Sequence, residues 1–581
     1  EQKGLLVFRG GDWQPLMASS SLPAGCIITD IVPYNQDTCL AASTRNGLFL
    51  LVKDKLLPFS LKNSPPERHF TSLAALDDQI FLAGTYSNGI VQFNRSGQVL
   101  ENINDKNGLI NNTVQCIRSD AAGNLWAGLD NGIAYMKSDA SIRLINPPSF
   151  RNGSGYAARV LNGELYFALS TGLQSLPLSS GSSLAQATGE PITLLEGLTW
   201  NLSVINNQLL TGRDDGCWTI SGHQVNRVSA SPGYWTYQPL SGKDSLKIAA
   251  GNYNGIRLFE AKNGLLTDQG GIPDFKESSR YLETEGNMIW VSHPYRGVFK
   301  IDLSNNRISR YTQKDGLPAD LDNHVFKLKG RIVFATPKGV YEYRAADDKM
   351  VPAAAYTALF GEMPLRYLKE DEKGNIWFVQ NKMVGVVDFG NAQPAIQFIP
   401  ELKNKILSGF ENIYPYNTQN VLIGSESGFY LLNYELYRQK RLPLRTYINL
   451  IKITGGIDSV LFGGFGDNNH AGGLDQPIPY QWNSLHFSFA TSIYGQYPGA
   501  EYSFWLEGFD KTWGNWTTQY EKDYTNLPEG KYVFHVKSRN TPSSESGEYT
   551  WTFSVSPPWY RTLWAYFMYA VALTALLYTL Y

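Results

Sequence analysis

The feature that most constrains this chain is a unit that recurs from residue 4 to residue 432. Each copy has an apolar strand, a polar turn with a glycine and a second apolar strand, as in LWAGLDNGIAYM at 125–136. Successive turn glycines lie 39 to 46 residues apart. They are Gly4, Gly47, Gly89, Gly132, Gly172, Gly216, Gly255, Gly297, Gly339, Gly385 and Gly428. A period of this length, with short strands in every copy, is typical of β-propeller blades.

Each blade is expected to have four strands. An inner strand precedes the central hairpin, as at 28–34 and 113–120, and an outer strand follows it, as at 98–103. A blade cannot bury both of its faces alone, so the copies must stack. An open β-solenoid is the alternative arrangement. The polar and variable connections between copies favour closed rings.

The composition and motifs favour binding over catalysis. A net charge of −2 gives no electrostatic reason to expect nucleic acid as a partner. The chain has no HExxH, GxSxG, phosphate-loop or EF-hand pattern. We therefore predict no catalytic residues, no metal site and no cofactor, and we predict that this region is not an enzyme.

The period stops after residue 445. Strict strand alternation with turn residues over 483–540 predicts a small antiparallel sandwich of immunoglobulin or fibronectin type. Residues 562–581 then carry no charge, and aromatic residues gather where this segment begins. A helix of that length spans a bilayer. We predict the start of a transmembrane helix at 559–581; a buried core helix is the alternative.

Two copies of the repeat resemble the regulator-propeller repeat of bacterial two-component sensors, of the type found in Bacteroidetes. In residues 107–132 the matching positions are Gly108, Leu109, Asn112, Asp120, Gly123, Leu125, Trp126 and Gly132. In residues 368–385 they are Asp371, Gly374 and Trp377. The copies at 165–172 and 208–216 depart from the pattern.

The segment after the repeats resembles the three-tyrosine domain that follows propellers in the same sensors. The matching residues are Tyr502, Leu506, Glu507, Gly508, Asp510, Trp513, Tyr524, Asn526, Leu527, Pro528, Gly530, Tyr532 and Val536. Together the two resemblances cover nearly the whole chain.

The resemblance implies an all-β fold of tandem β-propellers. We expect a partial first propeller of about four blades at 1–149, a seven-bladed second propeller at 150–445, the three-tyrosine sandwich at 446–556 and the helix. About three N-terminal blades would be missing. The resemblance also implies that residues 1–556 lie in the periplasm, anchored in the inner membrane by the helix, and that the receptor is a homodimer through the sandwich domain. The output would be a histidine kinase or a helix-turn-helix domain beyond Tyr581.

The candidate ligand site is one face of the second propeller, which the hairpin turns and the connections into the first strands share. The candidates are Trp200, Arg213, Trp235, Tyr253, His293, Tyr295, Arg296, Asn323, His324 and Lys338. Aromatic faces suit sugar rings, and forked donors suit hydroxyls or carboxylates. An oligosaccharide or another extracytoplasmic ligand is therefore the expected partner. The alternative is that these are ordinary residues of the propeller rim and form no ligand site.

We therefore interpret the chain as the ligand-sensing region of a transmembrane receptor, detecting a glycan and regulating transcription through its output domain. One competing interpretation is a structural or protein-interaction module of a cell-envelope complex. Another is a propeller lyase or glycosidase, for which His293, Tyr295 and Arg296 supply part of a catalytic set.

Overall fold

The computed structural model describes residues 4–62, 69–120, 123–137, 141–178, 184, 190–240, 246–262, 265–390, 393–439, 444–455, 459–463, 472–492, 500–541 and 544–581. The chain divides into two compact units, Glu1–Ala140 and Ser141–Tyr581. Each unit is described by itself.

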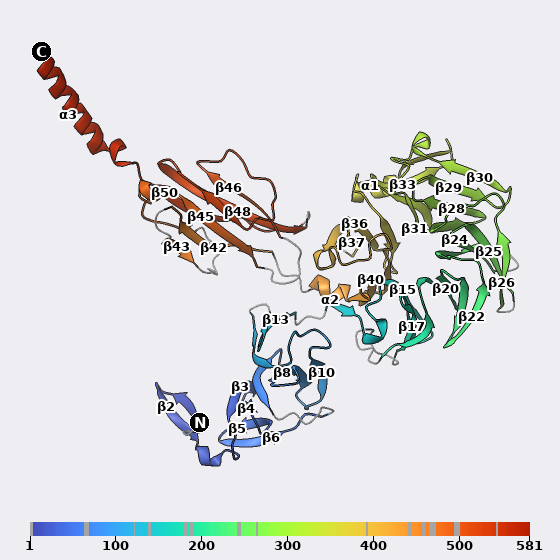
Figure 1. Cartoon of the computed structure of the whole chain (residues 1–581), viewed down its shortest axis with the longest axis horizontal. Helices are drawn as coiled ribbons and strands as arrows, with labels where there is room; N and C mark the ends of the chain where they lie inside the picture. The colour runs from blue at the N-terminus through green and yellow to red at the C-terminus, as the bar shows by residue number, and fades with distance from the viewer. Residues whose placement is uncertain are drawn as a thin grey trace. The chain divides into compact units, whose positions relative to one another are not determined.

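The first unit is a stack of antiparallel sheets, here called the arc (Figure 1). Its first sheet is the hairpin of β1 (Leu5–Arg9) and β2 (Asp12–Met17). Two four-stranded sheets follow: β3 (Ile28–Asn35), β4 (Thr38–Ser43), β5 (Leu48–Val52) and β6 (Lys55–Phe59); then β7 (Phe70–Ala75), β8 (Ile80–Thr85), β9 (Ile90–Asn94) and β10 (Val99–Ile103). The last sheet has β11 (Val114–Ser119), β12 (Leu125–Leu129) and β13 (Gly132–Met136). Apolar side chains pack between successive sheets, as an incomplete propeller requires.

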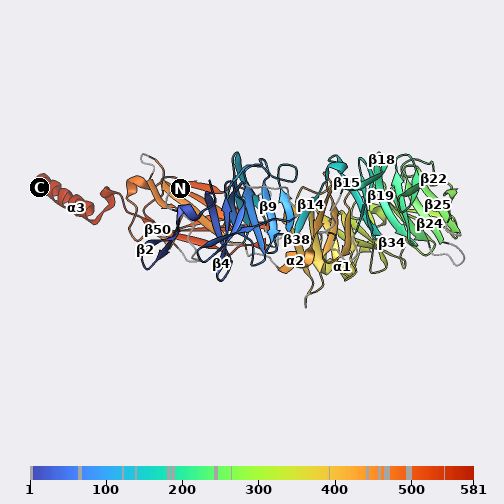
Figure 2. The ribbon, with the colours of Figure 1, turned by 90° about the horizontal axis from the view of Figure 1, so that it is seen from below.

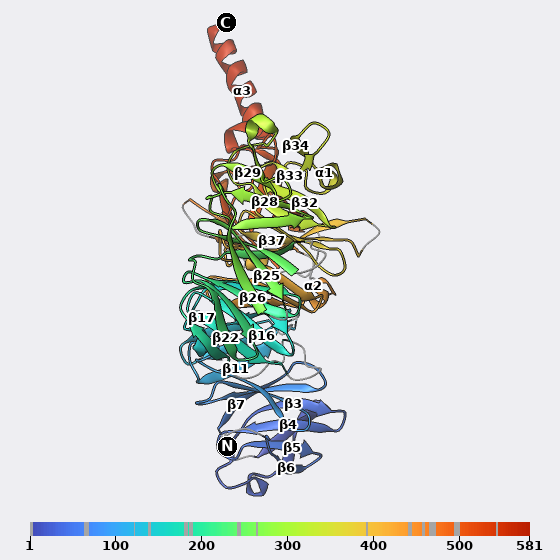
Figure 3. The same ribbon diagram turned by 90° about the vertical axis from the view of Figure 1, so that its right-hand side faces the viewer.

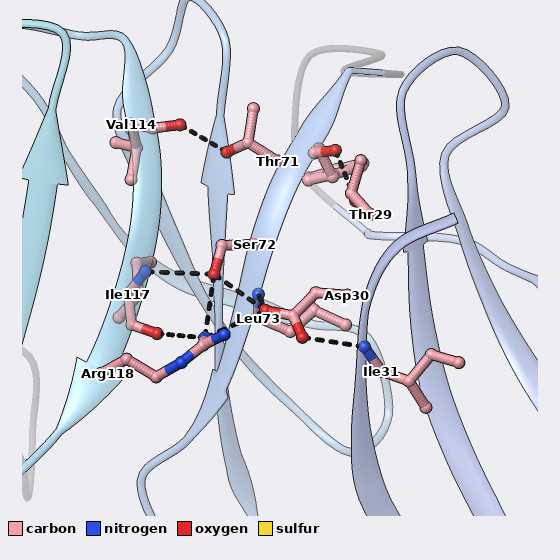
Figure 4. A network of polar contacts seen from close by, with 10 residues as sticks. Thr29, Asp30, Ile31, Thr71, Ser72, Leu73, Val114, Ile117 and Arg118 are labelled. Carbon is pink, nitrogen blue, oxygen red and sulfur yellow. Dashed lines mark hydrogen bonds and ion pairs between the residues drawn. The ribbon is translucent and has the colours of Figure 1, made fainter. Parts of the chain in front are cut away.

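Polar contacts join the first strands of three successive sheets of the arc (Figure 4). The carboxylate of Asp30 on β3 accepts hydrogen bonds from the Ser72 hydroxyl at 2.9 Å and the Leu73 amide at 3.0 Å. Arg118 on β11 lies 3.1 Å from the same oxygen. The Ser72 hydroxyl in turn accepts from the Ile117 amide at 3.0 Å. We call these five residues the Asp30 network.

The second unit begins with seven four-stranded sheets around one centre, here called the ring (Figure 1). Six of them use consecutive strands. The first two sheets are β15 (Gly155–Leu161), β16 (Glu164–Leu169), β17 (Gly172–Pro177) and β18 (Ile192–Glu196), then β19 (Thr199–Ile205), β20 (Gln208–Arg213), β21 (Cys217–Ser221) and β22 (Gln224–Ser229). The next two are β23 (Thr236–Leu240), β24 (Leu246–Asn252), β25 (Gly255–Lys262) and β26 (Leu265–Gly271), then β27 (Tyr281–Glu285), β28 (Met288–His293), β29 (Gly297–Asp302) and β30 (Arg307–Tyr311). The last two are β31 (His324–Leu328), β32 (Arg331–Thr336), β33 (Gly339–Arg344) and β34 (Lys349–Pro352), then β35 (Tyr367–Glu370), β36 (Ile376–Gln380), β37 (Met383–Asp388) and β38 (Ala395–Ile399).

The seventh sheet closes the ring with strands from both of its ends. It consists of β39 (Ile413–Asn417), β40 (Asn420–Gly424) and β41 (Phe429–Leu432), with β14 (Ile142–Ile145) antiparallel to β41. The inner strand β15 contacts both β39 and β40, so the first and last sheets are neighbours. Two short helices, α1 (Ala354–Phe360) and α2 (Tyr434–Gln439), follow β34 and β41.

Apolar clusters between neighbouring sheets hold the ring together. One cluster joins the sheet of β23 to the sheet of β27, with Ile256 and Ile289 among its members. Figure 3 shows the next step around the ring, where β28 and β29 lie beside β32 and β33. Each sheet thus buries its two faces against two neighbours, which is the reason that the repeats must stack.

The periodic glycines have a structural reason. Gly297 follows the turn between β28 and β29 with a φ of 77°, and a Cβ there would collide with the carbonyl oxygen of Tyr311. Only glycine tolerates both conditions easily. The prediction of a turn glycine was wrong at Gly385, which lies inside β37 opposite Phe378. The turn there uses Asn381 and Lys382 at positive φ, and a Cβ at Gly385 would meet the Phe378 ring.

Two sheets form the sandwich. The first contains β43 (Ser459–Gly463), β42 (Thr446–Ile453), β45 (Leu485–Thr491) and β47 (Glu521–Tyr524). The second contains β44 (Gly472–Gly473), β50 (Tyr549–Val555), β48 (Gly530–Thr541) and β46 (Glu501–Glu507), with β49 (Ser544–Glu545) on β48. Tyr502, Tyr524 and Tyr532 are all buried in their shared core. The Tyr524 hydroxyl donates to Asp510 at 2.7 Å, and the Tyr532 hydroxyl donates to the Pro528 carbonyl at 2.8 Å.

The helix α3 (Leu563–Leu580) follows the sandwich strand β50 (Figure 2). Its N-terminus is capped by Thr562, whose hydroxyl accepts from the Ala565 amide at 3.3 Å. Its side chains are apolar and almost all of them are exposed. At about 1.5 Å per residue the helix is long enough, and it is apolar enough, to cross the hydrocarbon core of a bilayer.

Candidate ligand-binding site

A cavity of about 170 Å³ lies at the centre of the ring. Its walls come from the inner strands β15, β19, β23, β27, β31 and β35 and from the segment just before β39. All seven sheets therefore contribute to one site. Positions on an inner strand alternate between the sheet interface and the centre, which brings side chains from distant parts of the sequence together.

Four aromatic side chains form one part of the wall, here called the aromatic wall: Tyr156, Trp200, Trp235 and Phe410. The rings of Trp200 and Phe410 are stacked, with centroids 5.4 Å apart at 11°. Trp235 lies 4.6 Å from Trp200, and Tyr156 makes edge contacts at 5.1 Å with both Trp200 and Phe410. All four are half-buried and line the cavity, so part of each ring borders the open space.

Arg280 lies against the aromatic wall. Its guanidinium carbon is 3.7 Å from the ring centroid of Phe410 and 5.4 Å from that of Trp235. It also donates a hydrogen bond to the carbonyl of Gly409. These contacts fix a planar cation next to aromatic faces, the combination that stacks on sugar rings and pairs with their polar groups.

Charged side chains line the cavity further along the inner strands. Lys327 on β31 donates from Nζ to the Thr284 carbonyl at 3.1 Å. Glu283 on β27 and Lys369 on β35 complete this group. Burial raises the pKa of Glu283 to about 7, although Lys369 and Lys327 favour its ionised form. Burial lowers the pKa of Lys369, and the charge of Arg159 adds to this effect.

Two of the predicted residues line this cavity, and a third, Tyr253, lies beside them. Trp200 and Trp235 belong to the aromatic wall, and the ring of Tyr253 lies 5.1 Å from that of Trp235. Tyr253 sits in the turn between β24 and β25 and is 36% exposed. The connection into β23 and the turn between β24 and β25 therefore lie side by side.

Asn323 and His324 are buried beside the cavity. The His324 ring contacts the Tyr281 ring at 4.6 Å, and Tyr281 lines the cavity. Burial, with Arg366 and Arg280 nearby, lowers the pKa of His324 to about 3. Asn323 donates to the Ala319 carbonyl at 2.9 Å. Both residues therefore support the wall, with His324 uncharged.

His293, Tyr295 and Arg296 form a separate group around Glu277. Arg296 pairs with the Glu277 carboxylate at 2.6 Å and His293 lies 3.5 Å from it. Burial lowers the pKa of His293 more than Glu277 raises it, and Arg296 and Arg310 lower it further. Tyr295 is 75% exposed. None of the four lines the cavity.

Arg213 and Lys338 do not line the cavity either. Arg213 is buried, pairs with Asp215 at 2.9 Å and donates to the Glu196 carbonyl at 2.7 Å. Its guanidinium ties a turn to the preceding sheet. Lys338 is exposed in the turn between β32 and β33.

Sequence reasoning missed Tyr156, Arg280 and Phe410. A signal was present, because Arg280 directly precedes β27 as Trp235 directly precedes β23. Phe410 lies three residues before β39, and Tyr156 is the second residue of β15. Searching the few residues around the start of every inner strand for aromatic and arginine side chains would have found these three.

Comparisons with known proteins agree with this architecture. Residues 493–556 match the Y_Y_Y domain family, which confirms the three-tyrosine resemblance in the sandwich. The comparison with curated protein sequences found no match.

One solved structure resembles most of the chain in its fold, and a second was compared with it. The extracellular domain of a hybrid two-component system from B. thetaiotaomicron has 16% sequence identity and a TM-score of 0.70, over 91% of this chain and 73% of that one. The extracellular domain of a one-component system from B. thetaiotaomicron has 15% identity and a TM-score of 0.40, over 96% and 79%. The chain therefore has the fold of the extracellular domain of a hybrid two-component system, with a Y_Y_Y domain at residues 493–556.

Proposed function

We propose that this chain is the ligand-sensing extracytoplasmic region of a transmembrane signal-transduction receptor, and that its ligand is a glycan. The observation that carries the proposal is the cavity of the ring, with the aromatic wall and Arg280 at its border. Aromatic faces gain from contact with the apolar faces of sugar rings, and the guanidinium supplies directional donors for hydroxyl groups.

Ligand binding in the ring is transmitted across the membrane in this proposal. The sandwich passes a change in the ring to α3, which crosses the inner membrane and leaves residues 1–556 in the periplasm. The receptor is a homodimer through the sandwich domain, and an output domain beyond Tyr581 regulates transcription. The fold match to an extracellular domain and the apolar helix α3 support this arrangement. In this proposal the region binds its ligand without transforming it.

The test is a thermal-shift screen of the full chain in detergent against neutral and acidic oligosaccharides. A ligand that binds only the folded state raises the melting temperature by mass action. We expect one glycan to give a reproducible shift that is lost in Trp235→Ala and kept in Tyr295→Ala. Circular dichroism establishes that both variants are folded.

Other outcomes of the screen count against the proposal. A shift that survives in Trp235→Ala would move the site away from the cavity. If no oligosaccharide in the panel gives a shift, the glycan proposal fails. The protein-interaction module of a cell-envelope complex then becomes the better interpretation.

A further inference from the structure

The charges that line the cavity are not balanced. Arg280, Lys327 and Lys369 are cationic, and Glu283 and Glu411 are acidic. Glu411 is engaged, because its carboxylate accepts from the Gly409 amide at 2.9 Å and lies 3.6 Å from Arg366. Of the acids that line the cavity, Glu283 is left to offset the two lysines, and Glu370, next to Lys369 in the chain, also favours the charge of Lys369.

Lys369 has no hydrogen bond or ion pair among the described residues of the chain. It projects from β35 into the cavity, and Arg159 on β15 is close enough to disfavour its charge. Arg159 itself lies over the ring of Tyr414 at 4.7 Å. The Lys327 ammonium makes one hydrogen bond among the described residues, to the Thr284 carbonyl. Glu283 and Glu370 favour the charged form of Lys369, but among the described residues no carboxylate is at ion-pair distance from it, so its ammonium group is available to the anion of a ligand.

The position of these lysines relative to the aromatic wall matches the length of a disaccharide. Arg280 lies three residues before Glu283 on the same chain segment, and Glu283 faces Lys327 and Lys369 on the next two inner strands. Three strand residues correspond to about 10 Å along the strand. A disaccharide with one ring against the aromatic wall would thus hold a substituent of its second ring near the lysines.

We propose that the cavity binds an anionic substituent of a saccharide, a carboxylate or a sulfate ester, between Lys327 and Lys369. The inference rests on the proposed function and specifies its ligand class. The aromatic wall contacts the sugar ring, and the lysine ammonium groups pair with the anion.

Glu283 gives the site a pH dependence. Burial raises its pKa to about 7, so near neutral pH the carboxylate is partly protonated. The charged groups that face it are Lys327 and Lys369, with Arg159 next to Lys369 and Arg280 earlier on its own segment. A bound anion disfavours the ionised form further, so binding takes up protons. Affinity for the anion is therefore expected to fall as the pH rises above 7.

The experiment is isothermal titration calorimetry of the full chain in detergent with three disaccharides. Digalacturonate carries carboxylates, neocarrabiose 4-sulfate carries a sulfate ester and galactobiose is neutral. We expect at least one anionic disaccharide to bind about tenfold or more tightly than galactobiose. The one that binds more tightly identifies the source of the charge. Titrations in two buffers of different ionisation enthalpy should show proton uptake, which Glu283→Gln abolishes.

Matched variants locate the effect. Lys369→Met should reduce the preference for the anionic disaccharide about tenfold, whereas Lys369→Arg keeps the charge and should retain it. Lys338→Met removes a lysine from an exposed turn of the same ring and should change nothing. Circular dichroism and the melting temperature confirm that each variant is folded.

Two outcomes would overturn the inference. If galactobiose binds as tightly as both anionic disaccharides, or if Lys369→Met keeps the preference, the anion site is wrong while glycan sensing stands. If none of the three binds, the anion site is also wrong, and the neutral glycans of the thermal-shift screen decide the sensing proposal separately.

Discussion

The arc and the ring are built from the same repeat, yet they treat charges on their inner strands differently. In the arc, Asp30 is bonded to Ser72, Leu73 and Arg118, and these contacts tie three sheets together. In the ring, Lys369 has no such partner among the described residues, and Glu283 faces two lysines across open space. A charge whose partners are all within the protein stabilises the stack of sheets. A charge without partners is available to a ligand.

The largest expected effect is a difference in stability between the two regions when the equivalent repeat tryptophan is removed from each. Trp377 in the ring and Trp126 in the arc each donate from Nε1 to an aspartate, at 3.1 Å and 3.2 Å. Trp377 is fully buried, whereas Trp126 is half-buried. We expect Trp377→Ala to lower the free energy of unfolding of the ring by about 3–5 kcal/mol, and Trp126→Ala to cost the arc about half of that. Hydrogen exchange resolved by peptide measures each region, and equal costs would show that burial does not distinguish them.

The next effect concerns the Asp30 network. Burial alone would raise the pKa of Asp30, but bonds from Leu73, Ser72 and Arg118 outweigh it and lower the pKa below its usual value of 3.8. Asp30→Asn should cost the arc about 2 kcal/mol at neutral pH, since it removes charge-assisted bonds. Because the folded-state pKa is depressed, this stabilisation is present above the unfolded pKa and is lost as the pH falls through the folded pKa.

A pH series of hydrogen exchange in the arc checks this prediction. The difference between wild type and Asp30→Asn should shrink below pH 3.8. Asp37→Asn is the control, because the Asp37 carboxylate is exposed and makes no hydrogen bond among the described residues. A difference that stays constant down to low pH would contradict a role for the Asp30 charge.

The pH dependence of stability that we expect from Glu283 is opposite to that expected from Asp30. Its folded-state pKa is raised from 4.5 to about 7, so its contribution to stability is fully present below 4.5 and is lost as the pH rises through 7. Glu283→Gln should therefore make the ring more stable than wild type at pH 8 and leave it unchanged near pH 4. Glu283 is half-buried and borders the cavity, so we expect a gain of about 1 kcal/mol, less than the full shift implies. Thermal unfolding of both proteins across this pH range measures this gain. A variant that is less stable than wild type at pH 8 would contradict the raised pKa of Glu283.

The smallest effect is expected at Tyr295. Its side chain is 75% exposed and does not line the cavity. Tyr295→Ala should change the free energy of unfolding by less than about 0.5 kcal/mol. It should also leave glycan binding unchanged, in contrast to Trp235→Ala. Loss of binding in this variant would place the ligand near Glu277 instead.

The repeat made the ring predictable, because each copy specifies its own hairpin and its inner strand locally. The closing strand β14 was not predicted. It pairs with β41 nearly 290 residues later, and no local pattern marks such a pairing. The error at Gly385 has a similar origin, since a glycine inside a strand and a turn glycine look alike in sequence when the period drifts.

The site was predictable only in part. Trp200, Trp235 and Tyr253 follow from the rule that turns and connections share a face, and the structure brings them together. The same rule also selected Arg213, whose charge is used within its own turn. Sequence cannot tell a cation with a partner from one without, and it gave no sign that Glu283, Lys327 and Lys369 meet at one centre. That distinction depends on how seven inner strands are arranged in space.

The most direct test of the account is hydrogen exchange of the full chain in detergent with and without the anionic disaccharide that binds more tightly in the titrations. We predict protection in peptides that contain the inner strands β19, β23, β27 and β35 of the ring, and little change in the arc. The protection should be lost in Lys369→Met and kept in Asp30→Asn. Protection confined to the arc or to the sandwich, or protection that Lys369→Met retains, would contradict the claim that the ring senses its ligand through unpartnered charges.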